Sequence, residues 1–336
     1  MKKYDVVALG ELLIDFTENG ISGQGNPIWE ANPGGAPCNL LAMLAKLGRS
    51  VAFIGKVGDD VYGRQLTDAL TETGINTTGL LVDKEVHTTL AIVGKKPNGD
   101  RDFAFYRDPG ADMMLTVSDL PLDLIKSARI FHFGTLSMTD EGVREATKAA
   151  VKTAKESGAL ISFDPNLRPP LWKSESSMKE QMVWGLGKCD VLKISDNELH
   201  FFTGETDFEK GANILRTQYQ DIKLISVTAG PDGSYTSYKN MFIHLPTYDV
   251  KTIETTGAGD TYGACVLNYI LDHGIDGLTE ENVVEMMRFA SAAASLITTR
   301  RGALRVMPSF EEINDLMKTP IERVQKEVPS NQILQN

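Results

Sequence analysis

The sequence predicts an α/β fold: a three-layer sandwich in which a mostly parallel central sheet lies between helices, with a small β lid at one end. Six short apolar runs rich in β-branched and aromatic residues have the length and composition of buried parallel strands. Helical patterns separate several of these runs, and that alternation places helices on both faces of one sheet. The six runs are Val6 to Leu9, Val51 to Ile54, Ile130 to Phe133, Leu160 to Phe163, Val191 to Ile194 and Leu224 to Val227.

Two of the intervening segments carry the helical pattern. Residues 39–47 place Leu40, Leu44 and Leu47 on one face of a helix, and residues 141–156 are rich in Ala and Lys. Both segments therefore fit helices that cover the sheet.

Two stretches interrupt the alternation and predict the lid. The stretch from 18 to 32 is polar and contains glycines, while residues 88–107 read as strand, turn and strand around Pro97, Asn98 and Gly99. We expect the lid over residues 12–33 and 88–108, approximately.

The rest of the chain reads as one unit. We expect a single domain over residues 1–318, followed by a loosely held polar tail over residues 319–336. Lids with exposed strand edges commonly pair across a dimer, so we also expect a homodimer through the lid.

Composition limits the partners. The chain has 336 residues, 42% of them hydrophobic, and can bury a sizeable core. A formal net charge of -11 argues against nucleic acid and anionic membranes as partners, because both are bound through clusters of basic residues. A small-molecule substrate is expected.

Cysteine spacing and the N-terminus indicate the compartment. Cys38, Cys189 and Cys265 lie far apart without CxxC spacing, which suggests neither a zinc cluster nor a disulfide framework. Acidic residues such as Asp5 and Glu11 interrupt the first apolar run, unlike the core of a signal peptide, and no run approaches the length of a membrane span. We expect a cytoplasmic protein.

The most informative segment is Gly257-Ala258-Gly259-Asp260, which follows two threonines and leads into an apolar helix. Small residues let consecutive backbone amides point into one concavity, where the helix dipole adds positive potential, so the turn suits a phosphate group. The carboxylate of Asp260 either caps the helix or accepts a proton from an attacking hydroxyl. The segment alone leaves both interpretations open.

A second segment suits a hydroxylated ligand. Gly34 and Gly35 allow a ligand close to the backbone, and the carboxamide of Asn39 can hydrogen-bond to hydroxyls. The alternative is a simple turn before a helix. A GxxxxGK[ST] loop and a dinucleotide fingerprint are both missing from the sequence, including after the first strand, which argues against a nicotinamide dehydrogenase.

These segments together resemble two signatures of the ribokinase-like (PfkB) carbohydrate kinases. Residues 34–39 with residues 55–63 resemble the N-terminal signature, and residues 255–260 resemble the C-terminal one. The resemblance extends from about Tyr4 to Met317 and implies a ribokinase-like fold.

The resemblance implies roles at the reacting end of the site. Asp260 takes the position of the catalytic base, and the amides of Gly257, Ala258 and Gly259 form an anion hole for the transferred phosphoryl group. The residues implied in sugar binding are Asp15, Gly34, Gly35 and Asn39. The alternative for Asp15 is a solvated strand end.

Two further motifs resemble those of fructokinases and 2-keto-3-deoxygluconate kinases. In Phe105-Tyr106-Arg107 the outer two side chains would face the sugar, and the alternative is an exposed arginine on a lid edge. In the loop that begins Asp164-Pro165-Asn166-Leu167-Arg168, Asn166 would contact the sugar and Arg168 the γ-phosphate. The alternative is a rigid loop.

The nucleotide site is implied by weaker patterns. Lys193, Ser195 and Glu198 match an N-x-x-E motif in which serine replaces asparagine, and Glu198 would hold Mg2+ through water. The alternative for Glu198 is a carboxylate in the first turn of a helix. The other implied nucleotide contacts are Thr228, Gly230, Gly233, Thr256, Gly257, Gly259, Ala290 and Ala294. Without the resemblance, the alanines fit ordinary helix packing.

One departure concerns a monovalent cation. The C-terminal signature usually begins with Asp, but this chain has Glu254, which leaves a K+ site open.

The expected function is that of an ATP- and Mg2+-dependent fructokinase with Asp260 as general base. The lid motif, the 164–172 loop and the opening GELLIDF resemble fructokinases most. The alternatives are 2-keto-3-deoxygluconate kinase, which would use Arg107 or Arg168 for the substrate carboxylate, other sugar or ribonucleoside kinases, and a sugar-binding homologue without activity.

Overall fold

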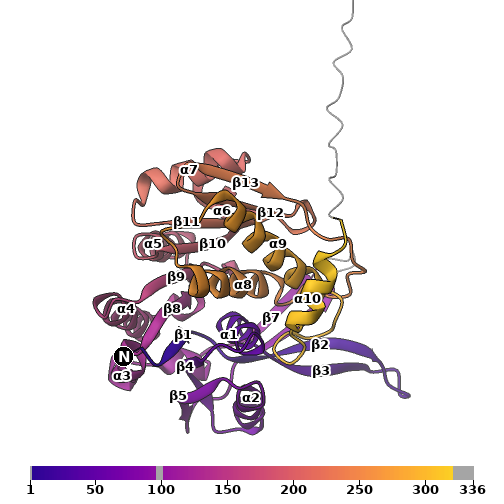
Figure 1. Cartoon of the computed structure of the whole chain (residues 1–336). Coiled ribbons are helices and arrows are strands. Elements are labelled where there is room, and N and C mark those ends of the chain that lie inside the picture. Colours follow the sequence, from indigo (N-terminus) through magenta and orange to yellow (C-terminus); the bar gives the residue numbers. More distant parts are fainter. Residues whose placement is uncertain (1, 96–100, 321–336) are drawn as a thin grey trace, which may run out of the picture.

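The computed structural model describes residues 2–95 and 101–320 and contains a nine-stranded central sheet (Figure 1). The strand order is β13-β12-β11-β10-β9-β8-β1-β4-β5, in which β12 pairs antiparallel with both β11 and β13 and all other neighbouring pairs are parallel. The strands are β1 (Tyr4–Leu9), β4 (Val51–Gly58), β5 (Asn76–Asp83), β8 (Ala128–Gly134), β9 (Leu160–Asp164), β10 (Val191–Ser195), β11 (Leu224–Thr228), β12 (Ser234–Tyr238) and β13 (Met241–Leu245). The predicted α/β class is therefore confirmed.

Helices cover both faces of this sheet (Figure 1). They are α1 (Ala36–Lys46), α2 (Val61–Glu72), α3 (Leu122–Lys126), α4 (Glu141–Glu156), α5 (Glu175–Leu186), α6 (Asp196–Thr203), α7 (Phe208–Gln218), α8 (Ala258–His273), α9 (Glu280–Ile297) and α10 (Phe310–Met317).

The central strands are apolar throughout because each one contributes to two cores. In β1, Val6 and Ala8 pack in the core that contains α1, α8 and α9, while Val7 and Leu9 pack in the core that contains α4, α5 and α7. All four side chains are fully buried. This arrangement explains why an uninterrupted apolar run predicts a strand that is covered on both faces.

A second sheet forms the lid. Its strand order is β3-β2-β6-β7, with β2 (Leu13–Ile21), β3 (Pro27–Gly34), β6 (Leu90–Lys95) and β7 (Arg101–Tyr106). The β2–β3 hairpin projects beyond the body of the molecule (Figure 1). The turn expected around Pro97 to Gly99 lies outside the described residues, as does the expected tail from residue 321 onward.

The register of the lid aligns two of the predicted sugar contacts. Asp15 on β2 pairs with Ala91 on β6, and Ala91 pairs with Phe105 on β7. Residues that pair directly across strands point to the same face of a sheet, so Asp15 and Phe105 share one face of the lid.

Candidate active site

A cavity of about 320 Å3 lies where the lid meets the carboxyl ends of the central parallel strands. Ligands bind at this end of open α/β sheets, because the loops that follow the strands converge there. The lining residues come from the lid, the starts of α1 and α8, and the loops after β1, β9, β10 and β11. They include Glu11, Leu13, Asp15, Gly35, Asn39, Phe105, Asn166, Arg168, Lys193, Ser195, Thr228, Gly230, Thr255, Thr256, Gly257, Gly259 and Asp260.

The turn before α8 opens directly onto this cavity. Gly257 adopts the left-handed conformation with φ of 78°, and no side chain hydrogen-bonds to the helix start as a cap. A β-carbon at Gly257 would lie only 2.8 Å from Ala303 Cβ, so the turn requires glycine here. The Ala258 amide donates to the Thr255 carbonyl oxygen at 3.3 Å, and the amides of Gly259 and Asp260, which follow in the first turn of α8, are the ones available to an anion in the cavity.

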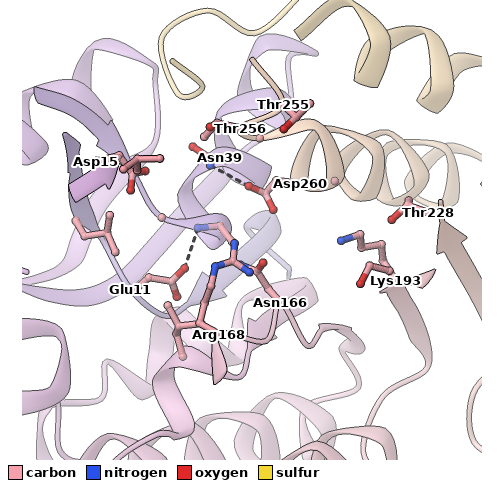
Figure 2. A pocket seen from close by; sticks show the side chains of 18 of the residues that line it. Glu11, Asp15, Asn39, Asn166, Arg168, Lys193, Thr228, Thr255, Thr256 and Asp260 are labelled. Carbon is pink, nitrogen blue, oxygen red and sulfur yellow. Dashed lines mark hydrogen bonds between the residues drawn. The ribbon is translucent and has the colours of Figure 1, made fainter. Parts of the chain in front are cut away.

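Asp260 lies in the first turn of α8 and faces the cavity (Figure 2). Burial and the nearby Asp164 carboxylate raise the pKa of Asp260 to about 6, although Lys193, Arg168 and a hydrogen bond from Asn39 act in the opposite direction. A carboxylate with a pKa just below neutrality is mostly ionised at pH 7 and still binds a proton well. It therefore suits a general base.

The first helix presents Asn39 to Asp260. The Asn39 Nδ2 atom donates a hydrogen bond of 2.9 Å to Asp260 Oδ2, and the Asn39 Oδ1 atom is buried without a hydrogen-bond partner among the described residues. Gly35 has φ of 121°, and a β-carbon there would lie 2.5 Å from the Glu11 carbonyl oxygen. The Gly-Gly turn is thus set by close backbone packing, and it leaves an unpaired acceptor beside the cavity.

Of the three predicted sugar contacts on the lid strands, Asp15 and Phe105 line the cavity. Gly34 is not among the lining residues, and its role is an indirect one. A β-carbon at Gly34 would lie 2.2 Å from Asp15 Oδ2, so the glycine leaves space for that carboxylate.

Arg107 differs from the expectation, because its guanidinium does not line the cavity. The side chain is only 2% exposed, and its Nε donates to Asp112 Oδ2 at 2.8 Å. Its other nitrogens donate to Thr139 Oγ1 at 2.9 Å and to the Leu136 carbonyl oxygen at 3.0 Å. Arg107 therefore supports the wall behind the cavity.

The loop after β9 contributes both of its predicted residues. Asn166 has φ of 43°, a conformation that asparagine tolerates better than most residues, and lines the cavity. Arg168 also lines it, and its Nη1 donates to the Leu167 carbonyl oxygen at 3.0 Å (Figure 2).

Lys193 and Ser195 on β10 line the cavity, whereas Glu198 on α6 does not appear among its lining residues. Glu198 accepts the Ser195 amide at 2.8 Å and the Leu167 amide at 2.7 Å. Ser195 in turn accepts the Glu198 amide at 3.3 Å, which makes the pair a capping box. Glu198 is thus a carboxylate in the first turn of a helix, which was the alternative interpretation of this residue.

The remaining nucleotide candidates divide into two groups. Thr228, Gly230 and Thr256 line the cavity. Gly233, Ala290 and Ala294 are not among the lining residues: Gly233 packs against the Leu245 carbonyl oxygen, Ala290 is fully buried, and Ala294 packs beside the same core. These three implied nucleotide contacts therefore lie outside the residues that line this cavity.

Glu254 joins two loops beside the anion turn. Its Oε1 accepts the Thr256 hydroxyl at 2.5 Å, and its Oε2 accepts the Gly302 amide at 3.2 Å. Both carboxylate oxygens are therefore already engaged by protein donors.

Glu11 was missed by the sequence reasoning. It is 3% exposed, lines the cavity, and accepts the Ala36 amide at 2.8 Å, so it caps α1 in place of Gly35 (Figure 2). Burial raises the pKa of Glu11 to about 7. Its position just after the first strand, where functional side chains gather, was an available signal.

Comparison with known proteins agrees with this arrangement. A family model described as pfkB family carbohydrate kinase matches residues 3–309. The probable fructokinase-2 of Arabidopsis thaliana is 38% identical over 319 residues, which cover 94% of this chain and 97% of the relative. Among solved structures, the ATP-bound fructokinase of Xylella fastidiosa has a TM-score of 0.83 at 29% identity and covers 95% of this chain and 99% of its own. The fructokinase of Vibrio cholerae O395 with fructose, ADP and a calcium ion has a TM-score of 0.84 at 30% identity and covers 94% and 99%.

Proposed function

The chain belongs to the pfkB family of carbohydrate kinases, and we propose that this ATP-dependent sugar kinase phosphorylates D-fructose. The observation that carries the proposal is the meeting of three features in one cavity: the open amide turn before α8, the carboxylate of Asp260 and the polar face of the lid. Similarity to fructokinases supports the choice of sugar.

In the proposed reaction, a fructose hydroxyl lies beside Asp260, which accepts its proton as the oxygen attacks the γ-phosphorus of ATP. A bond forms between the sugar oxygen and phosphorus, the bond to the β–γ bridging oxygen breaks, and ADP leaves. The amides of Gly257, Ala258 and Gly259 and the guanidinium of Arg168 stabilise charge on the transferred group. The lid excludes water that would compete as the acceptor.

Asp15, Gly35, Asn39 and Asn166 are the proposed partners of the sugar hydroxyls. The strongest support comes from Asn39, whose Oδ1 is a buried acceptor without a hydrogen-bond partner among the described residues. Such an acceptor costs free energy unless a donor reaches it, and a sugar hydroxyl is a suitable donor. We propose that Phe105 packs against the sugar ring.

At the other end of the cavity, Ser195, Thr228, Gly230 and Thr256 are the proposed ATP contacts. Gly233, Ala290 and Ala294 would act indirectly, by shaping the backbone that carries these residues.

The residues present fit Mg2+ that is held mainly by the phosphates of ATP. A cluster of three or more His, Cys, Asp or Glu side chains suited to a metal is missing from the described part of the chain, and Mg2+ commonly needs only one or two carboxylates besides the phosphates. Each Glu198 oxygen accepts one backbone amide and keeps capacity for a water. When bound, Mg2+ would neutralise phosphate charge.

Glu254 has a structural role that needs no cation. Its two oxygens accept hydrogen bonds from Thr256 and Gly302, so the carboxylate itself holds the two loops together. We expect turnover to change less than about twofold when K+ is replaced by tetramethylammonium. A change of that size is smaller than the change expected from the loss of one charge-assisted hydrogen bond. A larger loss would assign a cation to this region.

Two arguments favour a neutral ketose over 2-keto-3-deoxygluconate. The Arg107 guanidinium is committed to Asp112, Thr139 and Leu136. Arg168 is then the one arginine that lines the cavity in the described part of the chain, and it is also needed for the phosphate.

Several general properties complete the proposal. We propose a homodimer through the lid, supported by the exposed apolar side chains of Ile21, Ile28 and Trp29 on β2 and β3. We treat residues 1–318 as one catalytic domain and infer a cytoplasmic location, supported by three free cysteines. Among the described helices, each is too short or too polar to cross a membrane.

The decisive experiment measures ADP release with Mg2+ and ATP against fructose, 2-keto-3-deoxygluconate, ribose, glucose and adenosine. A preference for fructose supports the proposal. A preference for the keto-deoxy acid would transfer the assignment to that substrate, and ADP release that no sugar stimulates would reject kinase activity on this panel.

A further inference from the structure

The ammonium of Lys193 is held between a carboxylate and the turn that begins α8. Its Nζ atom lies 3.0 Å from Asp164 Oδ2 and 3.3 Å from Asp164 Oδ1. A β-carbon added to Gly259 would lie 2.8 Å from the same nitrogen. The ammonium is therefore in contact with the turn whose amides face the cavity.

The two strands bring this pair together. Asp164 ends β9, and its neighbours Ser162 and Phe163 pair with Val191 and Leu192 on β10. One further step along both strands sets Asp164 beside Lys193 on the same face of the sheet. The two side chains are only 6% and 14% exposed, so solvent screens their interaction weakly.

The charges around this pair decide what it can do. Asp164 on β9, Lys193 on β10 and Arg168 in the loop after β9 act on Asp260, and Glu198 on α6 also acts on Lys193. Two further titratable groups lie close by, because Asp260 acts on Cys38 of α1 and Lys193 acts on His132 of β8. Two of these groups are neutral near pH 7. Burial lowers the pKa of His132 to about 3 and raises that of the Cys38 thiol well above its ordinary value.

Lys193 keeps its charge in this setting. Burial disfavours its ammonium, but the carboxylates of Asp164, Glu198 and Asp260 outweigh burial and raise the pKa of Lys193. The cations that act on Asp260 are thus Lys193 and Arg168, and Lys193 forms its ion pair with Asp164.

We propose that Asp164 is a positioning residue, which holds the Lys193 ammonium against Gly259 and away from Asp260, so that the ammonium contacts the transferred phosphoryl group. This inference rests on the proposed kinase reaction and adds a catalytic contact to it. Without Asp164, the base itself becomes a competing partner of Lys193. An ion pair between Lys193 and Asp260 would withdraw charge from the phosphoryl group and weaken the base.

The test compares the pH dependence of kcat/KM for fructose in the wild type and three variants. In Asp164→Asn, the acid limb should move to lower pH by about one unit, because a like charge is removed and Lys193 is freed to pair with the base. In Lys193→Met, the limb should move to higher pH. Both variants should lose about tenfold or more in kcat, because the ammonium no longer contacts the phosphoryl group.

Asp190→Asn is the matched control. Asp190 accepts the Ile161 amide at 2.8 Å near the opposite end of the same pair of strands and does not line the cavity, so this variant removes one negative charge outside the site. Its acid limb should stay in place.

The outcomes separate this inference from the proposed function. An acid limb that stays in place in both Asp164→Asn and Lys193→Met overturns the positioning role, even if kcat falls. If Asp164→Asn does not fold, Lys193→Met decides alone. If the wild type turns over no sugar, the proposed function fails. In that case, protein stability still reports the effect of Asp164 on Asp260. The difference in melting temperature between a protein with Asp260 and its Asp260→Asn variant changes with pH around the pKa of Asp260. The midpoint of that change is measured once with Asp164 present and once with Asp164→Asn.

Discussion

Asn39 and Asp260 are 221 residues apart in the chain, and the Asn39 amide donates a 2.9 Å hydrogen bond to the Asp260 carboxylate. The bond joins the first turn of α8 to α1, so the two sequence signatures meet at one carboxylate. Because the bond takes up one lone pair of Asp260 Oδ2, we expect Oδ1 to be the better placed oxygen to accept a proton in the proposed reaction.

Replacing this carboxylate tests its role as the base. In Asp260→Asn, the amide oxygen can still accept the Asn39 hydrogen bond, but the side chain no longer takes a proton. We expect fructose binding to persist while kcat falls at least about 100-fold. Calorimetric titration and steady-state kinetics measure the two effects. Near-normal turnover would remove Asp260 as the base.

The same variant should reveal the energetic cost of the base. The pKa of Asp260 is about 6 in the folded protein against an ordinary value of 3.8, so this carboxyl favours folding below about pH 4, and that contribution is lost as pH rises through 6. The two values differ by about two units, so Asp260→Asn should be more stable than wild type at pH 8 by at most about 3 kcal/mol. Melting temperatures at pH 4 and pH 8 measure the difference.

Asp5 provides a control of opposite sign. Despite partial burial, hydrogen bonds from Ser50 and the ion pair with Arg129 hold the pKa of Asp5 below its ordinary value. Asp5→Asn should therefore lose stability at pH 8 and lose less as pH falls through the Asp5 pKa. A lower melting temperature for Asp260→Asn than for wild type at pH 8 would contradict the inference that the ionised Asp260 carboxylate destabilises the folded protein.

The sequence predicted the central strands well and the sheet edges poorly, for a physical reason. The six apolar runs correspond to β1, β4, β8, β9, β10 and β11, whose residues are covered on both faces. Two strands toward the sheet edges were not predicted, for different reasons: β12 reads Ser-Tyr-Thr-Ser-Tyr and is mostly buried, but its buried side chains are largely polar, whereas the edge strand β5 is largely half-buried. A strand with polar buried side chains, or without two covered faces, shows no continuous apolar run.

Within the site, the sequence located residues that lie in turns and at strand ends better than those that depend on long-range packing. The Gly257–Asp260 turn is local and was readable. Strand alternation predicted that Arg107 faces the sugar, but β7 ends at Tyr106, so the alternation does not extend to the arginine. Its partner Asp112 lies in a short helical turn that the sequence did not indicate.

Arg107 should therefore matter for stability more than for sugar affinity. In Arg107→Met, the buried Asp112 carboxylate loses its counter-charge, and we expect a loss of about 3–5 kcal/mol in the free energy of unfolding. Adding Asp112→Asn removes the unpaired charge and keeps an acceptor for the Thr89 hydroxyl, so the double variant should recover part of that loss. Urea unfolding measures both. A large rise in fructose KM without a loss of stability would instead support direct sugar contact.

The lid hairpin predicts how two copies of the chain associate. Trp29 is 37% exposed on β3, and Ile21 on β2 is more exposed and pairs with Pro27, two residues from Trp29, so Ile21 and Trp29 share one face of the hairpin and present an apolar surface that a second copy can cover. A charge at the centre of such a surface is costly to bury. We expect Trp29→Glu to sediment as a monomer, while Val183→Glu, which changes an exposed valine on α5, sediments as the wild type does.

Because the same lid carries Asp15 and Phe105 on its cavity face, the Trp29→Glu monomer should also have a higher fructose KM. A wild type that sediments only as a monomer would reject the dimer, and a monomeric Trp29→Glu with unchanged KM would show that pairing does not support the sugar site.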